Sequence, residues 1–175
     1  MFPILETERL KLREITNEDA DAIFACFSND QVMEYYGSDA FQNIDQAKDL
    51  IELFSKNYLE KKTIRWGIEL KESNELIGTI GYHAWASKHR KAEIGYEIHP
   101  NYWRKGYASE AIQKVINYGF NEMDLTRIGA IIYLENYGSY RLLEKLGFQR
   151  EGILRKNMYQ NSKPHDTYIY SLIKE

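Results

Sequence analysis

Hydrophobic positions recur along the chain with two different periods, and the change of period marks the expected elements. Leu10 and Leu12 alternate with charged residues over 9–13, which is typical of a half-buried strand. Two segments with helical spacing follow, and their apolar positions are Ala20, Ile23, Phe24 and Phe27, then Ala47, Leu50, Ile51, Phe54 and Tyr58. Their starts, Thr16-x-x-Asp19 and Asn43-x-x-Gln46, resemble capping boxes. The opening third therefore predicts one strand and two helices.

A period of two returns at Thr63 and predicts three consecutive strands. The first has apolar residues at every second position from Ile64 to Leu70, and the second runs through Leu76 to Tyr82 after a polar, turn-like segment. The third covers residues 92–99 and ends at Pro100, because proline cannot donate to a strand ladder. These strands are expected to form a meander.

The strongest helical signal follows, over residues 108–123. A strand-like segment at 127–134 precedes a short helix that Gly147 ends, and strands at 148–158 and 167–173 close the chain. The predicted order is β-αα-βββ-α-β-α-ββ. Because a helix joins strands 92–99 and 127–134, we expect these two to be parallel with a right-handed crossover. The prediction is a mixed α/β sheet with helices on its faces, in one domain spanning 1–175.

Composition narrows the class of protein. Hydrophobic residues make up 43% and charged residues 28%, which is typical of a globular chain. The net charge of −3 argues against a nucleic-acid partner. Cys26 is the single cysteine, so no disulfide can form within the chain, which is consistent with a reducing compartment. Because Cys26 lies in an apolar run, we expect it in the core. No signal peptide, membrane span or metal-ligand spacing is seen, so we expect a cytoplasmic protein without a metal.

The segment Trp103–Ala108 joins the third strand to the long helix and carries the first chemical signal. A glycine and a small residue at the first helical turn leave unpaired N–H groups and the positive end of the helix dipole accessible, with Arg104 and Lys105 beside them. This is the geometry that a phosphate requires. The alternative is a tight helix start with two solvated basic residues, and neither a P-loop nor G-x-G-x-x-G is present.

Longer blocks of sequence give this turn a context. The blocks Glu-Ile-Gly-Tyr-Glu-Ile-His-Pro (93–100), Tyr-Trp-Arg-Lys-Gly-Tyr-Ala-Ser-Glu-Ala (102–111), Glu-Asn-Tyr-Gly-Ser (135–139) and Glu-Lys-Leu-Gly-Phe (144–148) occur in order. Together they resemble the GNAT acetyltransferases, in particular the branch of ribosomal-protein N-terminal acetyltransferases (RimJ/RimL-like). The opening at 6–13 and the ending at 165–172 resemble the same branch.

The resemblance implies the GNAT fold, with its two central parallel strands splayed apart, and acetyl-CoA as co-substrate. It places Gly106 and Ala108 at the last fixed positions of the pyrophosphate motif, with Trp103 where many relatives carry Gln or Arg. The pantetheine arm would bond like an added strand to backbone near Ile98, and also to Asn136. The cofactor-binding candidates are Ile98, Arg104, Lys105, Gly106, Tyr107, Ala108, Asn136 and Arg141.

Attack on a thioester requires a neutral amine. At pH 7 deprotonation costs about 1.4 kcal/mol for an α-amine but nearly 5 kcal/mol for a lysine-like amine. Glu93 and Glu97 share a face of the third strand. The resemblance places Glu93 where several relatives carry a general base, and Glu97 is a candidate for substrate binding. The alternative for both is a solvated strand residue.

The leaving thiolate needs a hydrogen-bond or proton donor. Many relatives carry a tyrosine at the position of Leu143, and this branch is proposed to use the serine that is here Ser139. Ser139 also lies where a helix N-cap is expected, and Tyr140 is an alternative donor. Tyr35 and Tyr36 resemble the loop that shapes the acceptor pocket, with ordinary packing as the alternative.

These features predict an N-acetyltransferase that transfers the acetyl group directly in a ternary complex. The favoured acceptor is the α-amine of a protein or peptide. A small amine (polyamine, amino acid or aminoglycoside) is the runner-up, and a non-catalytic acetyl-CoA-binding protein is the third alternative. The composition permits a homodimer without requiring one.

Overall fold

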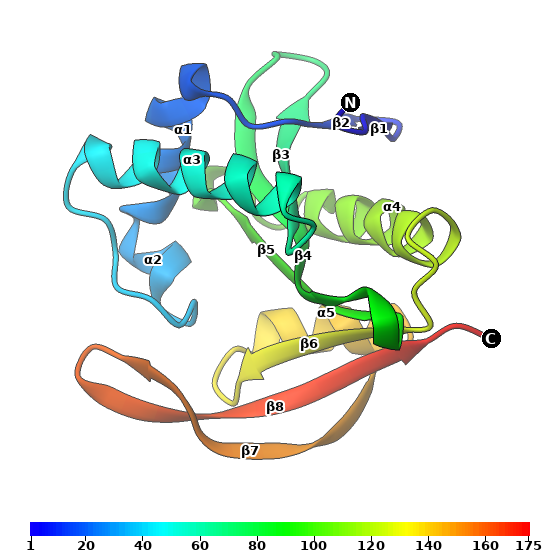
Figure 1. Ribbon diagram of the computed structural model, residues 1–175. Helices are drawn as coiled ribbons and strands as arrows, with labels where there is room; N and C mark the ends of the chain where they lie inside the picture. Colours follow the sequence, from blue (N-terminus) through cyan, green and yellow to red (C-terminus); the bar gives the residue numbers. More distant parts are fainter.

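The computed structural model describes residues 1–175 and contains an eight-stranded mixed sheet, whose strands are labelled in Figure 1. The order across the sheet is β1-β2-β3-β4-β5-β6-β8-β7, and only β5 and β6 are parallel. The strands are β1 (Leu5–Glu6), β2 (Leu10–Arg13), β3 (Ile64–Leu70), β4 (Leu76–Ala86), β5 (Lys91–Ile98), β6 (Arg127–Tyr133), β7 (Gln149–Gln160) and β8 (Lys163–Ile173).

Five α-helices and three single turns of 3-10 helix connect these strands. They are α1 (Ala20–Phe27), α2 (Asp30–Met33), α3 (Ile44–Leu59), α4 (Tyr107–Asn121) and α5 (Tyr137–Lys145), with η1 (Asn17–Asp19), η2 (Ser87–His89) and η3 (Pro100–Tyr102). The predicted mixed sheet and order of elements are confirmed. The additions are β1 and α2, which are too short for a hydrophobic period to reveal.

Each face of the sheet has its own core. Trp66 and its neighbours across the strands pack under α4 and α5, and the Trp66 ring meets Tyr118 of α4 edge-on at 5.3 Å. On the other face, α1 and α3 enclose a smaller cluster that includes Ile23 and Cys26. Cys26 is 1% exposed, so its predicted place in the core is confirmed.

The two parallel strands separate soon after they meet. β5 and β6 pair only from Lys91↔Arg127 to Glu93↔Gly129, although both strands continue further. At the free end of β5 the His99 N–H donates to the Ile77 carbonyl of β4 at 2.8 Å. Backbone groups of an antiparallel strand alternate in direction, so those of Tyr96 and Ile98 face the gap that β6 leaves. The expected splay between the central strands is therefore present.

Candidate functional site

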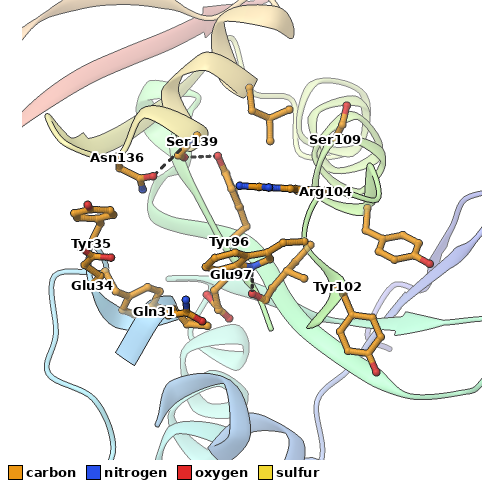
Figure 2. A pocket seen from close by; sticks show the side chains of 18 of the residues that line it. Gln31, Glu34, Tyr35, Tyr96, Glu97, Tyr102, Arg104, Ser109, Asn136 and Ser139 are labelled. Atoms are coloured by element: carbon orange, nitrogen blue, oxygen red, sulfur yellow. Dashed lines mark hydrogen bonds between the residues drawn. The ribbon is translucent and has the colours of Figure 1, made fainter. Parts of the chain in front are cut away.

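A cavity of about 610 Å³ lies at this gap, a size typical of a small-molecule site. It is bounded by the end of β5, the first turns of α4 and α5, and the α2 segment (Figure 2). The lining residues that matter below are Gln31, Glu34, Tyr35, Tyr36, Tyr96, Glu97, Ile98, Trp103, Arg104, Gly106, Tyr107, Ala108, Asn136 and Ser139.

One end of the cavity is the start of α4. Gly106 precedes the helix with φ +81°, a left-handed conformation that glycine adopts without steric cost, and no side chain caps the helix. The first-turn N–H groups are therefore free of a capping partner. Arg104, with φ +60°, also lines the cavity, whereas Lys105 does not.

Arg9 of the N-terminal segment supports this turn from behind. Its Nη1 donates to the Lys105 carbonyl at 2.9 Å, its Nε donates to Glu110 Oε2 at 2.8 Å, and its guanidinium lies 4.4 Å from the centre of the Tyr107 ring. These contacts hold the loop before α4 against the first turn of the helix. No pattern in the sequence indicates this role, because Arg9 lies about a hundred positions from its partners.

Trp103 occupies part of the gap between the splayed strands. Its indole Nε1 donates to the Ile98 carbonyl at 2.6 Å, and the residue is 43% exposed. Ile98 lines the cavity, and its carbonyl already accepts the hydrogen bond from the indole. A pantetheine arm that bonds to this carbonyl would have to displace the indole.

The first turn of α5 forms the opposite wall. Asn136 is its N-cap, and the Asn136 Oδ1 accepts the Ser139 N–H at 3.4 Å. The alternative interpretation of Ser139 as the N-cap is therefore wrong. The Ser139 Oγ instead lies 2.6 Å from the Tyr96 hydroxyl, as the dashed line in Figure 2 marks.

The other candidates on α5 do not line the cavity. The Tyr140 ring lies on a cluster with Tyr170 and the Arg150 guanidinium, which is 5.4 Å from the Tyr140 ring centre. Arg141 is exposed, and Leu143 is fully buried in the main core. Of these residues, the cavity brings together only Ser139 and Asn136.

The α2 segment closes the other end with aromatic side chains. Tyr36 meets Phe27 edge-on at 5.3 Å, and burial raises the pKa of the Tyr36 hydroxyl. Tyr35 meets Tyr133 of β6 in the same manner at 6.2 Å. Both tyrosines line the cavity and also pack against neighbouring aromatic rings of the fold.

Glu97 is the buried charge at this end. Its side chain is 3% exposed, and it accepts from the Arg65 Nη2 at 2.5 Å and from the Thr79 hydroxyl. Burial raises the pKa of Glu97, while the contacts with Arg65 and Thr79 act in the opposite direction. The alternative of a solvated strand residue is therefore wrong for Glu97.

Glu93 lies outside the cavity, at the last residue pair between β5 and β6. Its carboxylate is 3.2 Å from His83 Nε2, and the hydrogen bond with His83 lowers the pKa of Glu93. Both features favour a carboxylate that stays ionised beside its partner.

The cavity reaches both faces of the sheet. Tyr96 pairs with Ile80, which pairs with Trp66, so Tyr96 lies on the face that α4 and α5 cover. Glu97 is the next residue and lies on the opposite face, where Arg65 is 5.9 Å from the Phe54 ring of α3. The gap beside β5 therefore connects a helix N-terminus on one face with a tyrosine-lined wall on the other.

Comparison with known proteins identifies the family to which this chain is similar. Residues 9–149 match the family described as "Acetyltransferase (GNAT) domain". The uncharacterised N-acetyltransferase YoaA of Bacillus subtilis (strain 168) is 59% identical over 99% of this chain and 98% of YoaA. YdaF of the same organism, provisionally named a ribosomal N-acetyltransferase, is 30% identical over 99% of this chain and 96% of YdaF.

A solved structure is similar over the same length. Spermidine N-acetyltransferase from Vibrio cholerae, in complex with CoA and spermine, superposes with a TM-score of 0.84 at 26% identity, covering 95% of this chain and 96% of that chain. Within the present chain, no group of three or more His, Cys, Asp or Glu residues is placed to hold a metal ion. None of its helices combines the length and apolar content that a membrane crossing requires.

Proposed function

The chain belongs to the GNAT acetyltransferase family and is an acetyl-CoA-dependent N-acetyltransferase, and we propose that its acceptor is the α-amine of a protein or peptide. We also propose that transfer is direct, and the observation that carries this proposal is the cavity that passes through the gap beside β5. Two substrates that enter from opposite faces of the sheet would meet at Tyr96, Glu97 and Ser139. Binding the amine and the thioester side by side favours direct transfer, because the reaction between the two bound groups is then effectively unimolecular.

At the α4 end, the chain offers a site for a pyrophosphate. The uncapped N–H groups of the first turn and the positive end of the helix dipole favour an anion, and the Arg104 side chain adds a positive charge. The Asn136 Oδ1 is engaged by Ser139, which leaves its amide nitrogen as a donor for the pantetheine arm. We assign the Ser139 hydroxyl to the thioester sulfur.

The state of Glu97 supports an α-amine as acceptor. Both carboxylate oxygens already accept hydrogen bonds, from Arg65 and Thr79, so Glu97 is suited to holding the acceptor wall rather than removing a proton. An α-amine needs little help, since its deprotonation at pH 7 costs about 1.4 kcal/mol, against nearly 5 kcal/mol for a lysine-like amine. The 30% identity with YdaF supports the same acceptor class.

A small polyamine is the second candidate. The Vibrio cholerae enzyme, whose structure contains spermine, is similar over nearly the whole chain. Glu34, an exposed acidic residue on the cavity wall, would favour a polycation. This candidate differs from the first in predicting a strong dependence on salt.

The deciding experiment measures thiol release from acetyl-CoA with matched acceptors. The panel contains short peptides with free and acetylated N-termini, spermidine, spermine, free amino acids and an aminoglycoside. We expect turnover with free peptides only, rising with pH up to about 8, where the α-amine becomes neutral. A higher kcat/KM for spermidine than for every peptide would overturn the proposal in favour of the second candidate.

A further inference from the structure

Two hydroxyl groups lie within hydrogen-bond distance in the cavity, and one of them has no role in the function proposed above. The Tyr96 hydroxyl and the Ser139 Oγ are 2.6 Å apart. They come from β5 and from α5, which follows β6, and Figure 2 shows both side chains directed into the same space. The contact spans 43 positions of sequence, so the fold rather than local structure creates it.

Each hydroxyl has the other as its hydrogen-bond partner. No second hydrogen bond is formed by the Tyr96 hydroxyl or by the Ser139 Oγ, while the Ser139 backbone N–H is held by Asn136. Two hydroxyl groups carry two hydrogens, and the contact between them uses one. When Tyr96 donates, the Ser139 hydrogen is left free to point into the cavity.

The proton affinities decide what this pair can do. Burial raises the pKa of Tyr96 to about 12, so the phenol stays protonated near neutral pH. A thiol with a pKa near 8.5 is the stronger acid, so full proton transfer from the phenol to a thiolate would be unfavourable by about three orders of magnitude. The pair is therefore suited to hydrogen bonding with a thiolate rather than to protonating it.

We propose that Tyr96 is a positioning residue: it donates to the Ser139 Oγ and so directs the Ser139 hydrogen at the sulfur of the leaving thiolate. This role rests on the proposed function. As the amine nitrogen bonds to the carbonyl carbon, the carbon–sulfur bond breaks and its electron pair stays on sulfur. The nitrogen loses its proton to water. The Ser139 hydroxyl hydrogen-bonds to the new negative charge, and Tyr96 keeps its own proton throughout.

The kinetic test compares single and double variants. Ser139→Ala is expected to lower kcat about a hundredfold, and Tyr96→Phe about tenfold, with the KM for acetyl-CoA unchanged in both. In the Ser139→Ala background, Tyr96→Phe should have no further effect, since its only route to the sulfur is gone. Tyr118→Phe is the matched control, because it removes a tyrosine hydroxyl that makes no hydrogen bond, on α4 away from the cavity.

A second measurement needs no acceptor at all. The ultraviolet absorbance of the thiolate gives the pKa of the CoA thiol when it is bound, titrated between pH 6 and 9, below the range of free tyrosine. The thiol of Cys26 does not interfere, because burial raises its pKa to about 12. We expect the wild-type protein to lower the pKa of the bound thiol, and Tyr96→Phe and Ser139→Ala each to return it toward the value of free CoA.

The outcomes separate this role from the proposed function. If CoA binds but Tyr96→Phe leaves both kcat and the pKa of the bound thiol at wild-type values, the role of Tyr96 is overturned alone. If the wild-type protein does not bind CoA, the proposed function and this role are overturned together. Should Tyr96→Phe prove unstable in thermal unfolding, the pKa of the bound thiol in Ser139→Ala still tests the pair.

Discussion

Backbone conformation singles out Arg104 among the residues of the cavity. Its φ of +60° is left-handed, which costs a non-glycine residue roughly 1–2 kcal/mol. Strained residues often occur at functional sites because another gain offsets the cost. At Arg104 the gain that we infer is a positive charge beside the first turn of α4.

Arg104→Gly should therefore change stability and affinity in opposite senses. Relief of the strain exceeds the extra entropy of glycine in the unfolded chain, so the free energy of unfolding should rise by about 0.5 kcal/mol. The KM for acetyl-CoA should rise about threefold, as for the loss of one exposed charge. Urea unfolding and initial rates give the two values. Lys156→Gly, at φ +49° and outside the cavity lining, should gain stability without a change in the KM for acetyl-CoA.

Cys26 provides a prediction for the chemistry of transfer. Its thiol is buried and its pKa is raised to about 12, so it should be inert to a disulfide reagent at pH 8 until guanidinium unfolds the chain. Cys26→Ala should keep full turnover and lose about 1 kcal/mol of stability, as expected for a small core truncation. A stable acetyl group on Cys26, detected by mass spectrometry, would contradict direct transfer.

At the scale of elements, the start of α4 is the feature on which the co-substrate site depends. Gly106→Ala places a methyl group at φ +81°, which should lower the free energy of unfolding by about 1 kcal/mol. The new methyl group would lie 3.3 Å from the Arg9 Nη2 and disturb the turn that we assign to the pyrophosphate. We therefore expect the KM for acetyl-CoA to rise about tenfold. Gly152→Ala has open space around the new methyl group and is the control.

The elements also show how far sequence patterns extend. Periodicity predicted the long strands and helices because each buries one face, and Asn43 with Gln46 forms the expected capping box. It did not predict α2, whose four residues are shorter than a usable period.

Periodic patterns in the sequence do not predict contacts between elements that are distant along the chain. The pairing of Glu97 with Arg65 and of Tyr96 with Ser139 depends on which elements become neighbours, and a single sequence carries no record of that. Ser139 and Asn136, which the resemblance singled out, line the cavity together with Tyr96. Tyr96 lies within the block 93–100, but the resemblance gave it no role.

At the scale of the whole molecule, one side chain joins the last hairpin to the acceptor loop. Gln160 ends β7 and is 4% exposed. Its amide nitrogen donates to the carbonyls of Met33 (2.6 Å) and Ser38 (2.9 Å), and its oxygen accepts from the Gly37 N–H at 3.0 Å and the Tyr133 hydroxyl at 2.8 Å. The loop that carries Tyr35 and Tyr36 is therefore fixed from across the molecule.

Gln160→Leu should release this loop. Leucine leaves four polar groups without their partner, so the free energy of unfolding should fall by about 3 kcal/mol. The KM for the acceptor should rise while the KM for acetyl-CoA stays the same, since α4 is not involved. Gln149→Leu, at the exposed opposite end of β7, is the control. Equal changes in both KM values would contradict a specific role for Gln160.

Because the ladder between β5 and β6 is short, the stability of the folded protein should depend on the concentration of its acetyl donor. Three residue pairs hold two blocks of strands together along that seam, and on the proposed function the bound donor fills the rest. A ligand present at a hundred times its Kd stabilises the folded chain by about 2.7 kcal/mol, which a thermal-shift titration with CoA would measure. A cell with abundant acetyl-CoA should then retain the enzyme, and a starved cell should degrade it sooner.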